Sequence, residues 1–140
     1  LRLVALSGIA GVGKSTLALW HAHMYIQAEP NRLALWVRAE SEASIKASYL
    51  RILEDVLEVH VPADVDALSA QQIADRWLRR ALAKKQRAGV EWLLVFDNIP
   101  EAPTGPRTAS PISGNLDLLA PWFFSDLGGL TGSIIFTSRR

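Results

Sequence analysis

Four short segments of the chain are apolar almost without interruption, and they constrain the fold more than any other feature. They are Leu3–Leu6, Leu33–Val37, Trp92–Phe96 and Ile134–Phe136. Continuous apolar runs, rather than alternating ones, are typical of strands that are buried on both faces, as in parallel sheets. Because helical patterns lie between these runs, the sequence predicts an α/β fold with a parallel sheet. Any ligand is then expected at the carboxyl ends of the strands.

Three helices are predicted between the apolar runs. The first runs from about Lys14 to Ala28, because Pro30 disfavours helical geometry in the residue before it. Its apolar stripe is formed by Leu17, Trp20 and Met24. The stripe of the second helix is spaced by three, four and seven residues and contains Ile45, Tyr49, Ile52, Leu53, Val56 and Leu57. The third helix starts at a capping box of Ser69 and Gln72 and ends before Gly89.

Composition and charge indicate one ordinary folded domain. The chain has 140 residues, of which 49% are hydrophobic and 21% charged, as is usual for globular proteins. Its net charge of +1 gives no global reason to expect nucleic acid or a membrane as a partner. Because there is no cysteine, disulfides and thiolate metal sites are excluded, and a cytoplasmic setting is the simplest expectation.

The remaining segments carry fewer signals. Between Pro100 and Gly114 the composition turns to proline, glycine, serine and threonine, which predicts an exposed loop. The apolar stretch Leu116–Phe124, interrupted by Pro121, predicts a short helix that packs back on the sheet, and the alternative is an interface surface. Tryptophans in apolar-patterned segments are expected to pack in the core, and these are Trp20, Trp36, Trp77 and Trp92. Both ends of the chain adjoin strand-like stretches, so we expect it to be a fragment of something larger.

A glycine-rich segment directly follows the first apolar run. Its sequence, Gly8-Ile9-Ala10-Gly11-Val12-Gly13-Lys14-Ser15, matches the pattern of glycine, four residues, glycine, lysine and serine or threonine. The glycines let backbone N–H groups turn inward around an anion where side chains would block the approach. A strand before the segment and a helix after it are the context that a phosphate-binding loop requires. A glycine-rich turn that merely contains a lysine is the alternative.

Each position of this loop has an expected role in binding ATP or ADP. The residues whose backbone surrounds the phosphates are Gly8, Gly11, Val12 and Gly13. Lys14 is expected to reach the terminal phosphates, and the Ser15 hydroxyl is placed to ligate a Mg²⁺ ion shared with them. Thr16 is expected to bond the innermost phosphate.

Polar residues end the later apolar runs. Asp97 follows the third run, where a strand carboxylate would face the magnesium ion, which is the Walker B position. Its neighbour Asn98 is an amide that cannot accept a proton from water, so we expect hydrolysis to be slow or absent. Thr137, Ser138 and Arg139 end the last run, in a position to sense the terminal phosphate. The alternatives are that Asp97 only starts a turn and that Arg139 is only solvated.

Four motifs occur in order along the chain. After the phosphate loop these are Leu35–Ser41 (LWVRAES), Leu93–Asn98 (LLVFDN) and Gly132–Arg139 (GSIIFTSR). Together they resemble the NB-ARC family of signalling NTPases, and their variants are most similar to those of fungal NOD-like receptors. The resemblance spans nearly the whole chain, and the order of the motifs is more specific than any single one. By motif match, it assigns nucleotide and magnesium contacts to Gly13, Lys14, Ser15 and Thr16, the Walker B acid to Asp97 and the sensor arginine to Arg139.

The resemblance implies a P-loop NTPase three-layer sandwich, with strand order 1-4-3-2 and a fifth strand beyond Arg140. Residues 1–140 would be a single partial NB-ARC domain, without the helical and winged-helix segments that normally follow. In that family, ADP holds a closed resting state, and exchange for ATP lets the subunits assemble into oligomers. The implied partners are therefore the nucleotide, neighbouring domains of the full-length chain and further copies. Asn98 departs from the second acidic residue that the family usually places there.

Two other functions are compatible with the same loop. A small-molecule or nucleotide kinase would also need a lid with arginines and an acceptor site. A degenerate domain that serves only as an interaction scaffold would bind no nucleotide. A GTPase is less consistent with the sequence, because the guanine signature of asparagine, lysine, any residue and aspartate does not occur.

Overall fold

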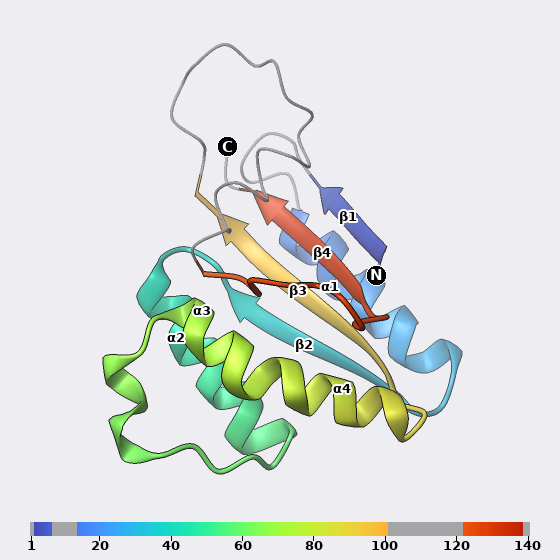
Figure 1. Cartoon of the computed structure of the whole chain (residues 1–140). Coiled ribbons are helices and arrows are strands. Elements are labelled where there is room, and N and C mark those ends of the chain that lie inside the picture. The colour runs from blue at the N-terminus through green and yellow to red at the C-terminus, as the bar shows by residue number, and fades with distance from the viewer. Residues whose placement is uncertain (1, 7–13, 101–121, 139–140) are drawn as a thin grey trace.

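A computed structural model describes residues 2–6, 14–100 and 122–138, with side chains described from residue 15 onward (Figure 1). The elements are β1 (Arg2–Leu6), α1 (Lys14–Ala28), β2 (Arg32–Arg38), α2 (Glu42–Arg51), the π-helical segment η1 (Ile52–Val56), the 3-10 helix η2 (Ala63–Ala67), α3 (Ala70–Ile73), the π-helical segment η3 (Ala74–Leu78), α4 (Arg79–Arg87), β3 (Glu91–Ile99) and β4 (Ser133–Ser138). The segments α2 and η1 are continuous, as are α3, η3 and α4. Each predicted strand and each of the three predicted helices is therefore present.

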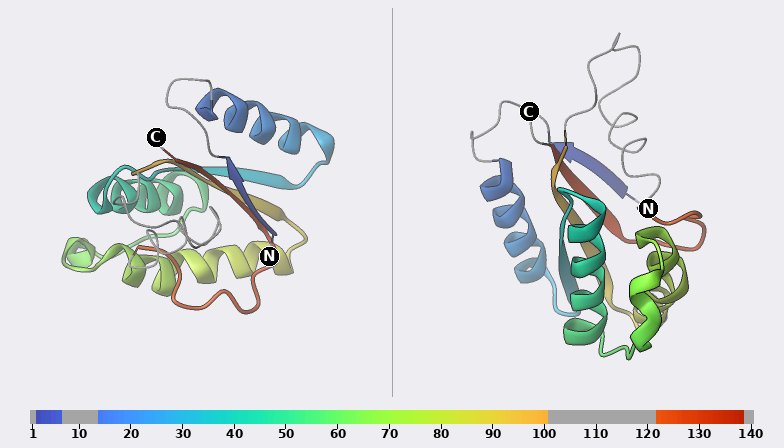
Figure 2. Two further views of the ribbon diagram at one scale, coloured as in Figure 1. Left: turned by 90° about the horizontal axis from the view of Figure 1, so that it is seen from above. Right: turned by 90° about the vertical axis from the view of Figure 1, so that its left-hand side faces the viewer.

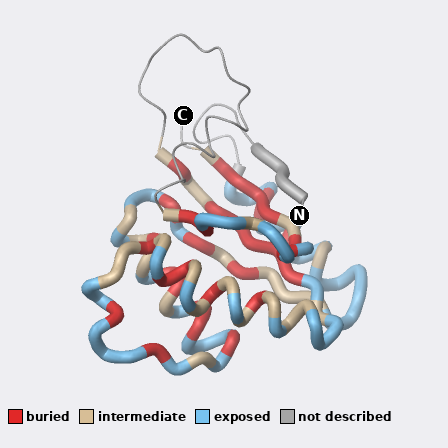
Figure 3. The backbone as a smooth tube through the Cα atoms, in the orientation of Figure 1, coloured by how far each residue is buried: buried red, intermediate tan, exposed pale blue. Residues whose placement is uncertain are grey.

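The strands form one parallel sheet in the order β1-β4-β3-β2. The α/β class predicted from the apolar runs is confirmed, and this order is the one that the resemblance implied. The central strands are buried over most of their length, as the red segments of β3 and β4 show in Figure 3. Because all four strands run in the same direction, their carboxyl ends gather at one edge of the sheet.

Helices lie on both faces of this sheet (Figure 2). On one face, α1 packs over a small cluster of buried residues formed by Ala18, Ala22, Leu93, Val95 and Ile135. The other face carries α2 and the α3–α4 helix, and the larger of the two hydrophobic clusters lies beneath them. Successive residues of a strand point to opposite faces, so β3 supplies Leu94 and Phe96 to the larger cluster and Leu93 and Val95 to the smaller.

The ends of the α3–α4 helix follow the predicted local signals. The Ser69 hydroxyl accepts a hydrogen bond from the Gln72 N–H (3.1 Å), and the Gln72 side chain accepts one from the Ser69 N–H (2.9 Å). At the other end, Gly89 has φ +85°, and its N–H donates to the carbonyl of Gln86 (3.0 Å). The N–H of Val90 donates to the carbonyl of Lys85, which completes a Schellman cap. The capping box and the role of Gly89 are thus confirmed.

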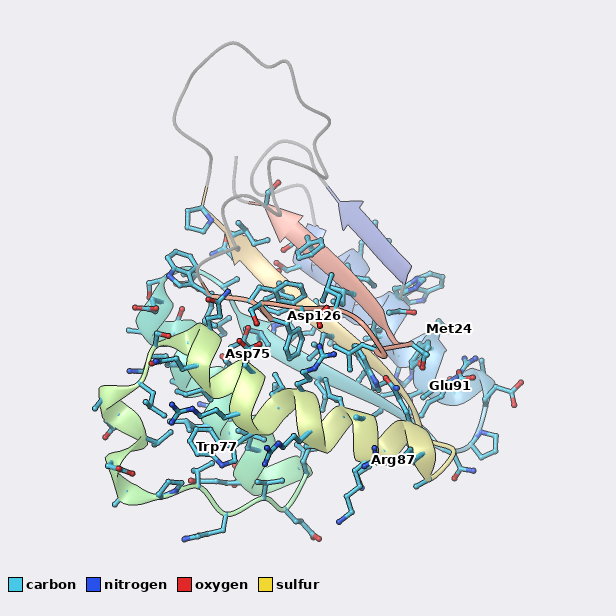
Figure 4. The ribbon with its side chains drawn as sticks, viewed as in Figure 1. Met24, Asp75, Trp77, Arg87, Glu91 and Asp126 are labelled. Carbon is cyan, nitrogen blue, oxygen red and sulfur yellow. The ribbon has the colours of Figure 1, made fainter. Side chains whose placement is uncertain are left out.

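The segment from Trp122 to Thr131 is held by side chains of the helices rather than by a helix of its own. These side chains are Tyr49, Asp75, Arg79 and Gln86, each of which is hydrogen bonded to the backbone of the segment. Asp75, labelled in Figure 4, accepts a hydrogen bond of 2.9 Å from the backbone N–H of Ser125, next to the labelled Asp126. The short helix predicted up to Phe124 is not found over Trp122–Phe124, although Phe123 and Phe124 are buried as expected. Residues 116–121 of that prediction, and the predicted loop after Pro100, lie outside the described residues.

The prediction for the buried side of α1 was wrong. Leu17, Trp20 and Met24 are 50%, 58% and 46% exposed, whereas Ala18 and Ala22 are buried against the sheet. The physical reason is the distance between the helix and the sheet. Small side chains such as those of Ala18 and Ala22 let α1 approach the sheet closely, whereas large side chains would hold it away. Trp20 is therefore not a core residue, in contrast to Trp92, which is completely buried. Trp36 and Trp77 are partly buried against the core.

Val56 also departs from the predicted stripe of the second helix, because it is 44% exposed. The cause is the π-helical segment η1, in which the N–H of Leu57 donates to the carbonyl of Ile52, five residues earlier. This wider turn rotates the following residues relative to an ordinary α-helix. Leu57 consequently points into the core and Val56 points away from it.

Candidate functional site

The predicted site lies at the carboxyl edge of the sheet. Strand β1 ends at Leu6 and helix α1 begins at Lys14, while residues 7–13 between them lie outside the described residues. Leu6 is paired with Thr137 of β4, and β4 lies beside β3. In Figure 1 the arrowheads of β1, β3 and β4 point to the same edge. The beginning of α1 therefore follows a strand that ends at the same edge of the sheet as the Walker B candidate Asp97, with β4 between the two strands.

The structure brings Ser15 and Asp97 into direct contact, although 82 positions separate them in the sequence. The Ser15 hydroxyl donates a hydrogen bond of 2.8 Å to Oδ1 of Asp97. Ser15 lies in the first turn of α1, and Asp97 follows the five buried residues Trp92–Phe96 of β3. Ser15 is exposed and Asp97 is half-buried, so both oxygen groups remain accessible to a ligand.

These two side chains fit a magnesium ion. Mg²⁺ prefers oxygen ligands and is usually held by one or two protein groups, with waters and substrate phosphates completing its coordination. A hydroxyl and a carboxylate within hydrogen-bonding distance of each other are such a donor set. The described part of the chain contains no group of three or more histidine, cysteine, aspartate or glutamate side chains that could hold a metal by themselves. A magnesium ion at Ser15 and Asp97 would take its remaining ligands from water or from a bound phosphate.

Thr137 lies near the end of β4, as predicted, but its hydroxyl is hydrogen bonded within the protein. Its side chain is buried, with 1% exposure, and its hydroxyl donates to Oδ1 of Asp97. The same hydroxyl accepts a hydrogen bond of 2.8 Å from the N–H of Asn98. This contact was not predicted from the sequence. The expected strand order of 1-4-3-2 could have predicted it. This order places the end of the fourth strand, with Thr137, beside the end of the third strand, with Asp97.

Several predicted site residues are only partly described. Thr16 is exposed in the first turn of α1, next to Ser15. Lys14 is the first residue of α1, but its side chain is not among those described. The remaining predicted site residues lie outside the described residues, and these are Gly8, Gly11, Val12, Gly13 and Arg139.

A cavity of about 940 Å³ lies at the opposite edge of the sheet, between the second half of α1 and the beginnings of β3 and β4. Met24 and Glu91, which help to line it, are labelled in Figure 4. Glu91 forms an ion pair of 2.9 Å with Arg32, whose guanidinium lies 4.4 Å from the centre of the Tyr25 ring. Burial and the charge of Glu91 raise the pKa of Tyr25. Arg32 also donates a hydrogen bond of 3.2 Å to the backbone carbonyl of Tyr25, so these contacts join α1, β2 and β3.

Comparison with known proteins gives a distant similarity that covers nearly the whole of this chain. No protein-family model matches the chain. A nucleotide-binding leucine-rich repeat (NLR)-like protein from Hyaloscypha variabilis is 27% identical over 140 residues, which cover 98% of this chain and 13% of that protein. The chain is therefore distantly similar to an NLR-like protein and spans only a small part of its length. Membership of the NB-ARC family stays a prediction.

A search of the described helices for membrane spans found none that is long and apolar enough.

Proposed function

We propose that this chain is the nucleotide-binding module of a signalling NTPase of the NOD-like receptor type. It would bind ADP or ATP with Mg²⁺ and act as a switch within a longer protein, with slow or no ATP hydrolysis. The fold would be that of a P-loop NTPase, with helices on both faces of the sheet. The complete phosphate-loop motif, the strand order and the distant similarity to an NLR-like protein all support the proposal.

The hydrogen bond between Ser15 and Asp97 is the observation that carries the proposal. The motif places a hydroxyl directly after the lysine, and the apolar run of β3 places a carboxylate at the end of a strand. Nothing local requires these two groups to meet across 82 sequence positions, yet their oxygens lie 2.8 Å apart. In P-loop NTPases, a magnesium ion bound to the nucleotide phosphates is held by a serine or threonine hydroxyl and an aspartate carboxylate of this kind.

The other loop residues would act on the phosphates directly. The backbone amides of Gly8, Gly11, Val12 and Gly13 would surround them, with the positive end of the α1 dipole behind. Lys14 would add a full positive charge at the terminal phosphates, and Thr16 would bond the innermost one. Arg139, the residue that follows β4 in the sequence, would sense the terminal phosphate. Asp97 would hold the magnesium ion.

Slow turnover follows from Asn98. A water molecule that attacks a phosphate is best activated by a carboxylate, and an amide cannot accept its proton. Asn98 is moreover half-buried, and its backbone N–H is bonded to Thr137. A switch that is reset slowly tolerates an amide at this position, whereas an efficient ATPase does not. In the intact protein, the partners would be neighbouring domains and, in the ATP-bound state, further copies in a cytoplasmic oligomer.

Calorimetric titration of the chain with MgADP and MgATP tests the proposal. We expect saturable binding of both nucleotides, and at least a tenfold loss of affinity for Lys14→Ala. Lys84→Ala is the matched control, because Lys84 is an exposed lysine of α4, the helix that leads into the start of β3 at the opposite edge of the sheet. The affinity of this variant should equal that of the wild type. If neither nucleotide binds a folded sample at millimolar concentration, the scaffold alternative is correct. Steady phosphoryl transfer to an added acceptor would instead favour the kinase.

A further inference from the structure

An irregularity in the sheet lies directly at Asp97. The pairing of β3 with β4 joins Phe96 to Phe136 and next Ile99 to Ser138. Over this stretch, β3 therefore advances by three residues while β4 advances by two, which is the pattern of a β-bulge. Bulges change the direction in which a strand points its side chains and occur frequently beside functional sites. The extra residue here redirects the side chain of Asp97 relative to a regular strand.

Asn98 occupies the strained position of this bulge. Its φ is +67°, in the left-handed region that most residues avoid and that asparagine tolerates better than others. This conformation turns the Asn98 N–H toward β4, where it donates to Oγ of Thr137 at 2.8 Å. The identity of residue 98 is therefore explained by backbone geometry, without a role for its side chain in catalysis.

The Thr137 hydroxyl links this strained backbone to the carboxylate. It accepts from Asn98 and uses its only proton to donate to Oδ1 of Asp97. Because Thr137 is 1% exposed, water does not compete for these bonds. The backbone of Asp97 is fixed as well, since its carbonyl accepts a hydrogen bond of 2.8 Å from the N–H of Ala39. Asp97 is thus held on both sides before any ligand arrives.

We propose that Thr137 is a positioning residue for the magnesium site, which rests on the function proposed above. Its hydroxyl, anchored by the bulge at Asn98, holds the Asp97 carboxylate in the direction of Ser15. Thr137 would therefore act through Asp97 on the metal and would not contact the terminal phosphate. Groups that orient a metal ligand commonly change metal affinity by about 10-fold to 100-fold when they are removed.

The test compares Thr137→Val with Thr137→Ser by calorimetric titration with ADP, once in excess Mg²⁺ and once in EDTA. Valine has nearly the same shape as threonine but lacks the hydroxyl, and serine retains it. We expect Thr137→Val to weaken binding about tenfold or more in Mg²⁺ and to leave the affinity in EDTA within about twofold. Thr137→Ser should behave as the wild type in both conditions. An equal loss in both conditions would show a direct phosphate contact or a general structural defect, and would overturn the proposal.

A second pair of variants tests the bulge independently of Thr137. Asn98→Gly retains access to positive φ, so it should keep the magnesium-dependent affinity. Asn98→Val has a β-branched side chain that disfavours this conformation, so it should reduce that affinity selectively. If Thr137→Val and Asn98→Val bind MgADP as the wild type does, while Lys14→Ala does not, the positioning role is wrong and the proposed function stands. Absence of nucleotide binding by the wild type in both conditions would instead remove both proposals.

Discussion

On the face of the sheet covered by α2 and α3–α4, helices and strands pack through large side chains, whereas on the opposite face α1 packs through alanines. The first face buries Phe96, whose ring lies 6.4 Å from that of Tyr49, 5.2 Å from that of Phe123 and 5.8 Å from that of Phe136. On the α1 face, the helix contributes only the small side chains of Ala18 and Ala22 as fully packed residues.

This difference shows that an apolar helix does not by itself reveal which side it buries. From Ser15 to Ala28, α1 has no lysine, arginine, aspartate or glutamate, and large apolar residues occur all around it. A helix that is apolar on every side is typically buried on every side. In this chain, the side that packs is the one whose small residues allow close approach to β3 and β4. The large residues remain exposed.

The largest effect is expected on the densely packed face. Phe96→Ala should lower the free energy of unfolding by about 3–5 kcal/mol, because it removes a completely buried aromatic ring and leaves a cavity. Its neighbour Val95 is equally buried but points to the α1 face and has a smaller side chain, so Val95→Ala, which removes two methyl groups, should cost only about 2 kcal/mol. Urea denaturation followed by circular dichroism measures both. Equal losses for the two variants would contradict the difference between the faces.

A smaller effect that depends on pH is expected at Tyr49, on the same face. Burial, together with a lesser contribution from the charge of Asp75, raises the pKa of Tyr49 above its ordinary value. Because the folded pKa lies above the unfolded value of about 10, the stability linked to the protonated hydroxyl is fully present below about pH 10 and is lost as the pH rises further.

Tyr49→Phe should therefore reduce stability by about 1 kcal/mol at neutral pH, since the hydrogen bond of 2.8 Å to the Trp122 carbonyl is lost. Above pH 10, the variant should lose stability less steeply than the wild type. Denaturation curves at pH 7 and at several values above pH 10 measure this. Parallel pH profiles for the two proteins would refute the assignment.

The smallest effect is expected on the outer side of α1. It tests most directly which side of this helix packs against the sheet. Trp20→Gln replaces the larger side chain but should change the unfolding free energy by no more than about 0.5 kcal/mol, because Trp20 is 58% exposed. The matched variant Ala22→Gln, two positions along, should cost about 2 kcal/mol or more, since it forces a larger polar group against the sheet. Thermal denaturation of the two variants distinguishes them. A greater loss for Trp20→Gln would mean that α1 packs as the sequence pattern had predicted.

Most of the fold could be predicted because its signals are local. The continuous apolar runs indicated β2, β3 and β4, and Pro30 marked the end of α1 where the structure has it. The capping box at Ser69 and the left-handed Gly89 likewise depend only on neighbouring residues. The exposed Val56 could not be predicted, because a π-helical turn changes the helical period without a clear mark in the sequence.

For the candidate site, the sequence by itself determined the kinds of group and their order along the chain: the glycine-rich loop, Ser15 after the lysine, and Asp97 at the end of a strand. Only the tertiary structure decided that Ser15, Asp97 and Thr137 meet, and that a bulge with Asn98 at positive φ redirects the carboxylate. The physical reason is that motifs and caps arise from interactions over a few residues, whereas the direction of a side chain at a sheet edge depends on strand register. That register is set by pairing between strands about 40 residues apart.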